Sequence, residues 1–176
     1  GNYIWSYKSD VGNQVGRDIT KTFDGGYAIL GINYAMLLEE IIIMKLNNNG
    51  EKEWIKTYYY PHPSSPNVMY EINQTQDSGF ILAGTTMTQS GFSDIWVMKL
   101  NKEGDSIWSK TIDYEGMDEG YSIKQMDDGN YILSAKSGND IYGRNTLLIY
   151  KLDEDGNETL LNSFNGNSSY HPYFIN

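Results

Sequence analysis

The sequence predicts an all-β protein built from repeated four-stranded antiparallel sheets, and a recurring motif is the main reason. The motif reads KLNNNGEKEW from Lys45, KLNKEGDSIW from Lys99 and, more weakly, KLDEDGNETL from Lys151, at spacings of 54 and 52 residues. The turn-like segments FDGGYAILG, QDSGFILAG and DDGNYILSA keep the same period. The chain contains 15 Tyr and 18 Gly but only 4 Pro, a mixture that favours strands and tight turns over helices.

Each copy of the repeat contains four strand-like runs. In the third copy these runs are residues 108–112, 120–126, 130–136 and 146–152. They are short, rich in β-branched and aromatic residues, and bounded by turn formers, as strands are. The stretch AMLLEEIIIMKL, residues 35–46, has a helix-like composition. Its counterparts FSDIWVMKL and RNTLLIYKL read as strands, so we predict a strand there too.

The connections between the runs are of two kinds. Tight Asp/Asn-to-Gly turns (DGG, DSG, DDG and NNNG, NKEG, DEDG) alternate with longer, more varied loops. In an antiparallel meander, alternate turns lie at opposite ends of the sheet. The long loops should therefore gather at one end, where binding is expected. These loops lie near residues 10–17, 32–40, 58–69, 85–94, 113–119 and 137–145.

Four short strands per unit of about fifty residues predict the blades of a β-propeller, since solenoid coils are usually shorter. We expect the GYSI-type runs to be innermost and the Trp-bearing runs outermost. The chain, residues 1–176, reads as a single repeat domain with copies at approximately 5–53, 54–107 and 108–159 and a partial copy at 160–176.

About three blades and a partial fourth do not close a ring, which needs at least four. The sequence therefore predicts a fragment of a longer protein, an open arc, or a ring completed by a partner, and we favour the fragment. An arc would leave open sheet edges, so self-association through those edges is expected.

The third copy carries the segments WSKTI, MDEGYSI, DDGNYILSA and YKLDEDG. This pattern resembles a repeat of about 52 residues found in exported bacterial (Bacteroidetes-like) lipoproteins and surface proteins, similar in style to delta-60 repeats. The resemblance covers most of the chain, although the first copy has VGRDI in place of DEGYSI. It implies propeller blades and an extracytoplasmic location (secreted, periplasmic or cell surface), and it carries no catalytic motif.

Charge and composition argue against several classes of partner and cofactor. The formal net charge of −10 repels nucleic acid and anionic membranes. The longest apolar run, around residues 41–44, is far too short to enter a bilayer as a span. Cysteine is absent, and neither histidine has neighbours at metal-ligand or catalytic spacing. The segment DEDGNE lacks the later Glu of a calcium loop. No metal and no cofactor are therefore expected.

Two sets of residues recur at the repeat period, and for each we weigh a functional interpretation against a structural one. The recurring tryptophans could stack on sugars, but their period favours packing between blades. The recurring aspartates could form repeated active sites, but turn residues that bond their own backbone explain them better. The two sets are Trp5, Trp54 and Trp108, and Asp24, Asp77 and Asp128.

The segment YYYPHPSSP is the most unusual loop, and it supplies our candidate ligand-binding residues: Tyr58, Tyr59, Tyr60 and His62. It is a local insertion, because the corresponding connection in the third copy is three residues shorter. Its three prolines stiffen it, and aromatic side chains on a rigid loop suit carbohydrate or peptide recognition. The alternative is a surface loop with no ligand.

The sequence thus predicts a non-catalytic binding or scaffolding module that presents variable loops to a glycan, a peptide or a surface protein. One alternative is a structural spacer or self-associating domain of a larger surface protein. Another is a glycan hydrolase using loop carboxylates. The carboxylates placed on or beside the long loops are Asp94, Asp118, Glu119 and Asp140.

Overall fold

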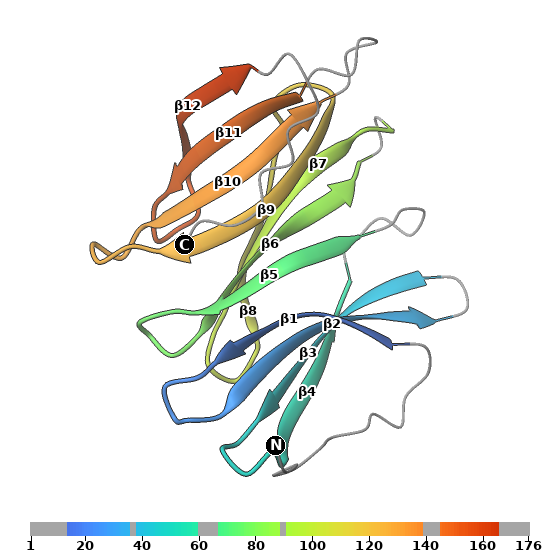
Figure 1. The fold of residues 1–176 in the computed structure, drawn as a ribbon, viewed down its shortest axis with the longest axis vertical. Helices are drawn as coiled ribbons and strands as arrows, with labels where there is room; N and C mark the ends of the chain where they lie inside the picture. The colour runs from blue at the N-terminus through green and yellow to red at the C-terminus, as the bar shows by residue number, and fades with distance from the viewer. Residues whose placement is uncertain (1–13, 36–37, 60–66, 89–90, 139–144, 166–176) are drawn as a thin grey trace, which may run out of the picture.

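The computed structural model describes residues 14–35, 38–59, 67–88, 91–138 and 145–165. Within these ranges the chain is all-β, with twelve strands and no helix (Figure 1). The strands form three antiparallel sheets of four strands each, and none of these sheets closes on itself. The predicted all-β class and the four-stranded sheets are confirmed.

Each sheet is a meander whose strands pair in chain order. Sheet 1 comprises β1 (Gln14–Lys21), β2 (Tyr27–Ala35), β3 (Leu38–Leu46) and β4 (Lys52–Tyr58). Sheet 2 comprises β5 (Val68–Gln74), β6 (Phe80–Met87), β7 (Ser93–Leu100) and β8 (Ser106–Ile112). Sheet 3 comprises β9 (Met117–Gln125), β10 (Tyr131–Gly138), β11 (Asn145–Leu152) and β12 (Glu158–Asn165). The helix-like stretch at 35–46 is therefore strand β3, as predicted.

The sheets are offset by one strand from the sequence copies. Each sheet begins with a GYSI-type run and ends with the first run of the next copy, which carries Trp54 in β4 and Trp108 in β8 but Leu160 in β12. The first strands make the principal contacts between sheets: β5 packs on β1 and β2, and β9 packs on β5, β6 and β7 (Figure 1). The Trp-bearing strands β4 and β8 lie at the opposite edge of their sheets.

Sheet 2 is buried on both faces because it lies between the other two sheets. Along β6, Phe80 and Leu82 enter the core shared with sheet 1, whereas Ile81 and Ala83 enter the core shared with sheet 3. Successive side chains of a strand point to opposite faces of the sheet, so a strand that is buried on both faces has a continuous run of apolar residues in its sequence. Two apolar cores, one on each side of sheet 2, thus hold the three sheets together.

The recurring aspartates close the tight turns, as predicted. Asp24 Oδ1 accepts a hydrogen bond from the Gly26 N–H at 2.9 Å, and Asp77 Oδ1 accepts the Gly79 N–H at 2.9 Å. The Asp128 carboxylate accepts the Asn130 N–H at 3.1 Å. These bonds satisfy backbone donors in the turns.

The lysine of the KL motif reaches the same carboxylates from the third strand of each sheet. The Nζ–Oδ2 distance is 2.8 Å for Lys45–Asp24, 2.8 Å for Lys99–Asp77 and 3.2 Å for Lys151–Asp128. Hydrogen bonds from Lys45 first, and then from Thr22, lower the pKa of Asp24 to about 2. The motif that defines the repeat therefore ties each tight turn to its own sheet.

Candidate functional site

The two ends of the sheets differ. The predicted tight turns lie on the left of Figure 1, and the opposite ends of the sheets lie on the right; we call this opposite end the loop end. The prediction of long loops near residues 32–40 and 85–94 was wrong: two residues separate β2 from β3, and five separate β6 from β7, as in the tight turns. The Thr88 N–H donates to the Phe92 carbonyl oxygen at 3.0 Å, a bond that the tight turns also make. Four large apolar side chains are exposed at the loop end, with fractional exposures of 41–57%. They are Tyr34, Tyr59, Phe92 and Met117. Exposed aromatic groups on a rigid scaffold are the usual anchors of a recognition surface.

The structure places two of the four predicted ligand-binding residues. Tyr58 is half-buried and donates its hydroxyl to the Gly104 carbonyl oxygen of sheet 2 at 2.6 Å, and burial raises its pKa. Tyr59 is exposed, and its hydroxyl donates to Glu40 Oε1 at 2.8 Å. Tyr60 and His62 lie outside the described residues. Of the two described residues, Tyr59 presents its ring to solvent, whereas Tyr58 connects sheet 1 to sheet 2.

A cluster of three carboxylates lies where sheets 2 and 3 meet near the loop end. It contains two of the predicted loop carboxylates, Asp94 at the start of β7 and Asp118 in β9. Burial, followed by the charges of Asp113 and Asp118, raises the pKa of Asp94 to about 6. Burial likewise raises the pKa of Asp118. Sequence reasoning missed Asp113, which lies in the connection between β8 and β9.

Asp118 also has a structural role. Its Oδ2 accepts the Tyr114 N–H at 2.5 Å and so closes the connection between sheets 2 and 3. In sheet 2, Asn67 occupies the equivalent position just before the first strand and accepts the Thr86 hydroxyl at 2.6 Å. A polar side chain at this position is therefore a repeated structural feature.

The remaining two predicted carboxylates do not join the cluster. Glu119 accepts a hydrogen bond from Lys136 at 2.9 Å and another from the Tyr121 hydroxyl at 2.5 Å. Asp140 lies outside the described residues.

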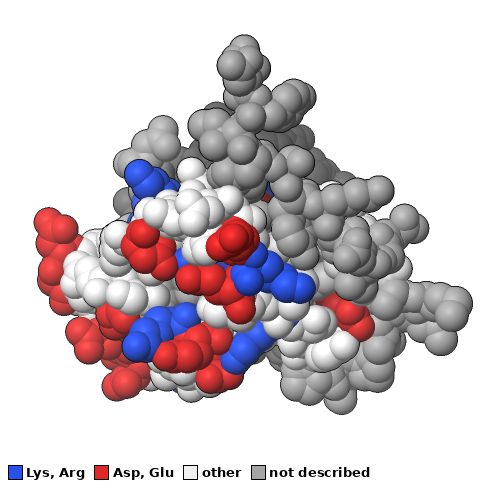
Figure 2. All heavy atoms as spheres, turned by 90° about the horizontal axis from the view of Figure 1, so that it is seen from below, with Lys and Arg blue, Asp and Glu red and all other residues white. Residues whose placement is uncertain are grey.

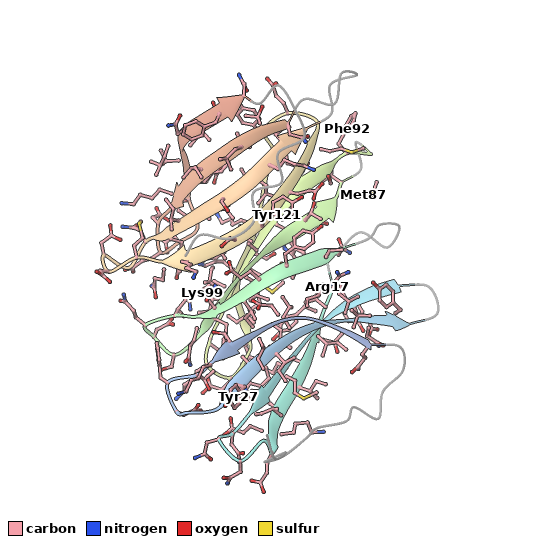
Figure 3. All side chains as sticks on the ribbon, viewed as in Figure 1. Arg17, Tyr27, Met87, Phe92, Lys99 and Tyr121 are labelled. Carbon is pink, nitrogen blue, oxygen red and sulfur yellow. The ribbon has the colours of Figure 1, made fainter. Side chains whose placement is uncertain are left out.

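A second cluster runs across the first strands of the three sheets. Each first strand carries a β-bulge at the same place in the repeat, and the extra residues are Arg17, Tyr70 and Tyr121. The Tyr70 and Tyr121 rings stack with centroids 5.3 Å apart, and Figure 3 shows Arg17 on β1 and Tyr121 on β9, with β5 between them. Bulges re-aim side chains and often lie beside binding sites. Their shared position in the repeat was the signal that sequence reasoning overlooked.

The described recurring tryptophans pack between sheets, as predicted. The Trp54 ring meets Phe80 of sheet 2 edge-on at a centroid distance of 5.9 Å, and the Trp108 ring meets Tyr131 of sheet 3 at 6.2 Å. Each indole also lies on the turn glycine of the next sheet: a Cβ on Gly104 would be 3.0 Å from Trp54, and one on Gly156 would be 3.1 Å from Trp108. We call this arrangement of indole, aromatic ring and turn glycine the Trp joint.

Two further links recur between neighbouring sheets. Asp18 Oδ2 accepts the Ile72 N–H at 2.9 Å, and Glu71 Oε2 accepts the Ile123 N–H at 2.6 Å. β5 and β9 each pair with another strand on one side only, so these carboxylates satisfy donors on a free strand edge. The side-chain oxygens of Gln74 and Gln125 accept turn N–H groups of the preceding sheet in the same repeated way.

Charged side chains are mixed on the end of the molecule seen in Figure 2, where basic and acidic groups lie side by side. The described residues contain no group of three or more His, Cys, Asp or Glu that could hold a metal ion. In the same part of the chain, no helix is long and apolar enough to cross a membrane.

Comparison with known proteins gave no match, either to a protein-family model or to a curated protein.

Proposed function

We propose that this domain is a non-catalytic binding or scaffolding module of an extracytoplasmic protein, with its three sheets arranged as blades of a propeller-type repeat. The module would bind a glycan, a peptide or another surface protein through the loop end. The exposure of Tyr59 and Phe92 there is the observation that carries the proposal. Side chains of this kind lose solvent contact favourably when a partner covers them.

The repeated and the non-repeated side chains have different roles, and this difference supports the proposal. The recurring Trp, Asp, Lys and Gln side chains bond within or between sheets and so maintain the scaffold. The exposed residues at the loop end do not follow the repeat. A scaffold that is fixed by repeated contacts and carries non-repeated side chains at one end is typical of recognition domains.

Charge narrows the class of partner. Glu40, Asp113 and Glu115 lie at the loop end, and the whole chain carries a formal net charge of −10. An uncharged glycan or a basic peptide therefore fits this surface better than an anionic partner does. These carboxylates could accept hydrogen bonds from sugar hydroxyls or from basic side chains, which would add to the aromatic contacts.

The experiment is a binding screen against glycan and peptide arrays, followed by titration of the best hit. Tyr59→Ala and Phe92→Ala should each weaken binding by about tenfold, because aromatic anchors dominate interface energies. Phe23→Ala is the matched control: Phe23 is 69% exposed but lies on a tight turn, at the other end of sheet 1. Equal losses in all three variants, or loss in Phe23→Ala alone, would contradict the proposal.

A structural spacer is the second candidate, favoured by the use of nearly every repeated side chain in contacts within or between sheets. A spacer would give no array hit that depends on Tyr59 or Phe92. The hydrolase alternative would use Asp94, whose pKa of about 6 suits a general acid. It requires turnover of a glycoside substrate that is lost in Asp94→Asn.

A further inference from the structure

The outward face of sheet 1, on the side away from sheet 2, repeats a surface that is an interface elsewhere in the chain. It carries Ile29, Met44 and Leu46 at positions equivalent to Leu82, Met98 and Leu100 of sheet 2. In sheet 2, these three residues belong to the core shared with sheet 1. By register, the outward face of sheet 1 therefore matches the face of sheet 2 that packs against the preceding sheet, and we expect it to be covered in the same way.

The burial of this face indicates that something covers it. Ile42, Met44 and Leu46 are at most 7% exposed. Among the described strands, those of sheet 2 pack on sheet 1, and they do so through the core on the opposite face. The outward face of sheet 3 behaves differently, because Leu147 and Ile149 remain partly exposed there.

The covering is incomplete and leaves an apolar groove of about 360 Å³. Its walls include Val15, Ile19, Ile29, Met44 and Leu46. Val15 and Ile19 are exposed at its rim.

We propose that the occupant of this face is the chain's own segment 1–13, held by Trp5 in a third Trp joint formed with Tyr27 and Gly50. Tyr27 is the residue of sheet 1 that corresponds to Phe80 and Tyr131, at the start of the second strand. Gly50 corresponds to Gly104 and Gly156: the φ angles of the three are +79°, +80° and +78°. Sheet 1 thus carries the aromatic ring and the turn glycine that contact an indole in sheets 2 and 3.

The length of the segment fits this role. Trp108 lies 13 residues before the bulge residue Tyr121 of β9, and Trp5 lies 12 residues before the equivalent bulge residue Arg17 of β1. Twelve extended residues span roughly 40 Å, which is ample for the distance between neighbouring sheets. The spacing from each Trp to its aromatic partner is also similar: 23 residues from Trp108 to Tyr131 and 22 from Trp5 to Tyr27.

The third joint should be weaker than the other two, because two of its polar links differ. In sheet 1 the free-edge N–H of Ile19 donates to its own neighbour, Asp18 Oδ1, at 2.8 Å, instead of to a carboxylate from a preceding sheet. Lys21 occupies the position of Gln74 and Gln125. The indole and the apolar face would therefore provide most of the attachment.

A second copy of the chain is the competing occupant. It would offer the exposed residues Leu160, Leu161 and Phe164 of β12. That strand has Leu160 where the other copies have Trp, so it has no indole to pack against Tyr27 and Gly50. The Trp5 segment is the better fit, and the experiment distinguishes the two.

A double-mutant cycle tests the contact directly. Trp5→Ala and Tyr27→Ala are made singly and together, and the urea midpoint of each is measured. The Trp108–Tyr131 pair serves as the positive control and the Trp5–Tyr131 pair as the negative control. The proposal predicts a coupling free energy between Trp5 and Tyr27 that differs from zero and has the same sign as the coupling free energy between Trp108 and Tyr131. Additive shifts, like those of the negative control, would overturn it.

Hydroxyl-radical footprinting of the wild-type protein provides a readout that does not depend on variants folding. Trp5 should be protected to a degree near that of Trp108, at concentrations where sedimentation shows a monomer. Oxidation of Trp5 at the rate of an exposed indole would overturn the proposal. Protection of the Met44 region that appears only in a sedimenting dimer would assign the face to a second copy. The proposal is independent of the loop-end function, since none of these measurements involves a ligand.

Discussion

Replacing Lys99 by methionine should destabilise the protein far more than the same change at Lys151, although both lysines belong to the recurring motif. Lys99 Nζ lies 2.8 Å from Asp77 Oδ2, 3.1 Å from Thr75 Oγ1 and 3.0 Å from the Leu100 carbonyl oxygen. Its side chain is 5% exposed, whereas that of Lys151 is 39% exposed. Methionine keeps most of the aliphatic stem, so the comparison isolates the ammonium group.

The magnitudes follow from burial. Loss of the Lys99 ammonium removes a donor from two buried groups, the Thr75 hydroxyl and the Leu100 carbonyl oxygen, at a cost of about 2–4 kcal/mol; the Asp77 side chain is 55% exposed and contributes little to this difference. The Lys151–Asp128 pair is solvent-accessible, and removing it should cost about 0–1 kcal/mol. With an unfolding slope of about 2 kcal/mol per molar urea, Lys99→Met should lower the midpoint by about 1–2 M.

The assay is urea unfolding followed by tryptophan fluorescence, with the midpoint and slope fitted for each variant. Lys151→Met is the matched control, since it alters the same motif in sheet 3, where the lysine is accessible to solvent. Equal shifts in the two variants, or a shift below about 0.3 M for Lys99→Met, would refute the reasoning that burial decides the value of this contact.

Three further predictions concern carboxylates. Glu71→Ala should cost about 2–3 kcal/mol because it leaves the Ile123 N–H without its acceptor, while Glu71→Gln should cost less than half as much; equal losses in urea unfolding would contradict this. Asp24 is half-exposed, and its pKa of about 2 lies below the ordinary 3.8, so its stabilisation is present above about pH 4 and lost as the pH falls toward 2. After allowance for solvent screening, Asp24 should contribute about 1 kcal/mol to the free energy of unfolding above pH 4. Asp24→Asn should remove this contribution, so that the free energy of unfolding falls about 1 kcal/mol less between pH 4 and pH 2 than it does in the wild-type protein. Asp94 has the opposite sign: its pKa of about 6 means that folding favours the protonated form, so stability should fall as the pH rises from 4 through 6. Asp94→Asn should therefore stabilise the protein by about 2 kcal/mol at pH 8 and hardly at all at pH 4, and a pH-independent effect would argue against a buried, charge-coupled carboxylate.

The sheets could be predicted because their signals are local. The tight turns, the alternation of short apolar runs and the fixed period each act over a few residues, and they agree with one another. Even residues 35–46, with their helix-like composition, form the strand that the other copies indicated. Pairing in a meander follows chain order, so no long-range information was needed.

The contacts between segments were harder to predict, because they depend on how the sheets twist and stack. Lys99 and Asp77 are 22 residues apart, and sequence reasoning explained the aspartate as a turn residue without finding its partner. The signal was present, since both residues keep the repeat period in all three copies.

The candidate site was predicted in part. Tyr58 and Tyr59 are adjacent in sequence, yet strand alternation directs one toward sheet 2 and leaves the other exposed. A β-bulge changes that alternation by one residue, which is why the Tyr70–Tyr121 stack was not expected. Bulges depend on local pairing register, and single-sequence patterns seldom reveal them.

The central claim is that duplicated sheets are joined by the residues that define the repeat, and amide hydrogen exchange tests it most directly. Ile72 and Ile123 donate across a sheet boundary from a free strand edge, where an unpartnered N–H would exchange rapidly. The account predicts slow exchange at both amides, with Asp18→Ala accelerating only Ile72 and Glu71→Ala accelerating only Ile123. Exchange of both amides in the wild-type protein at the rate of loop amides would contradict it.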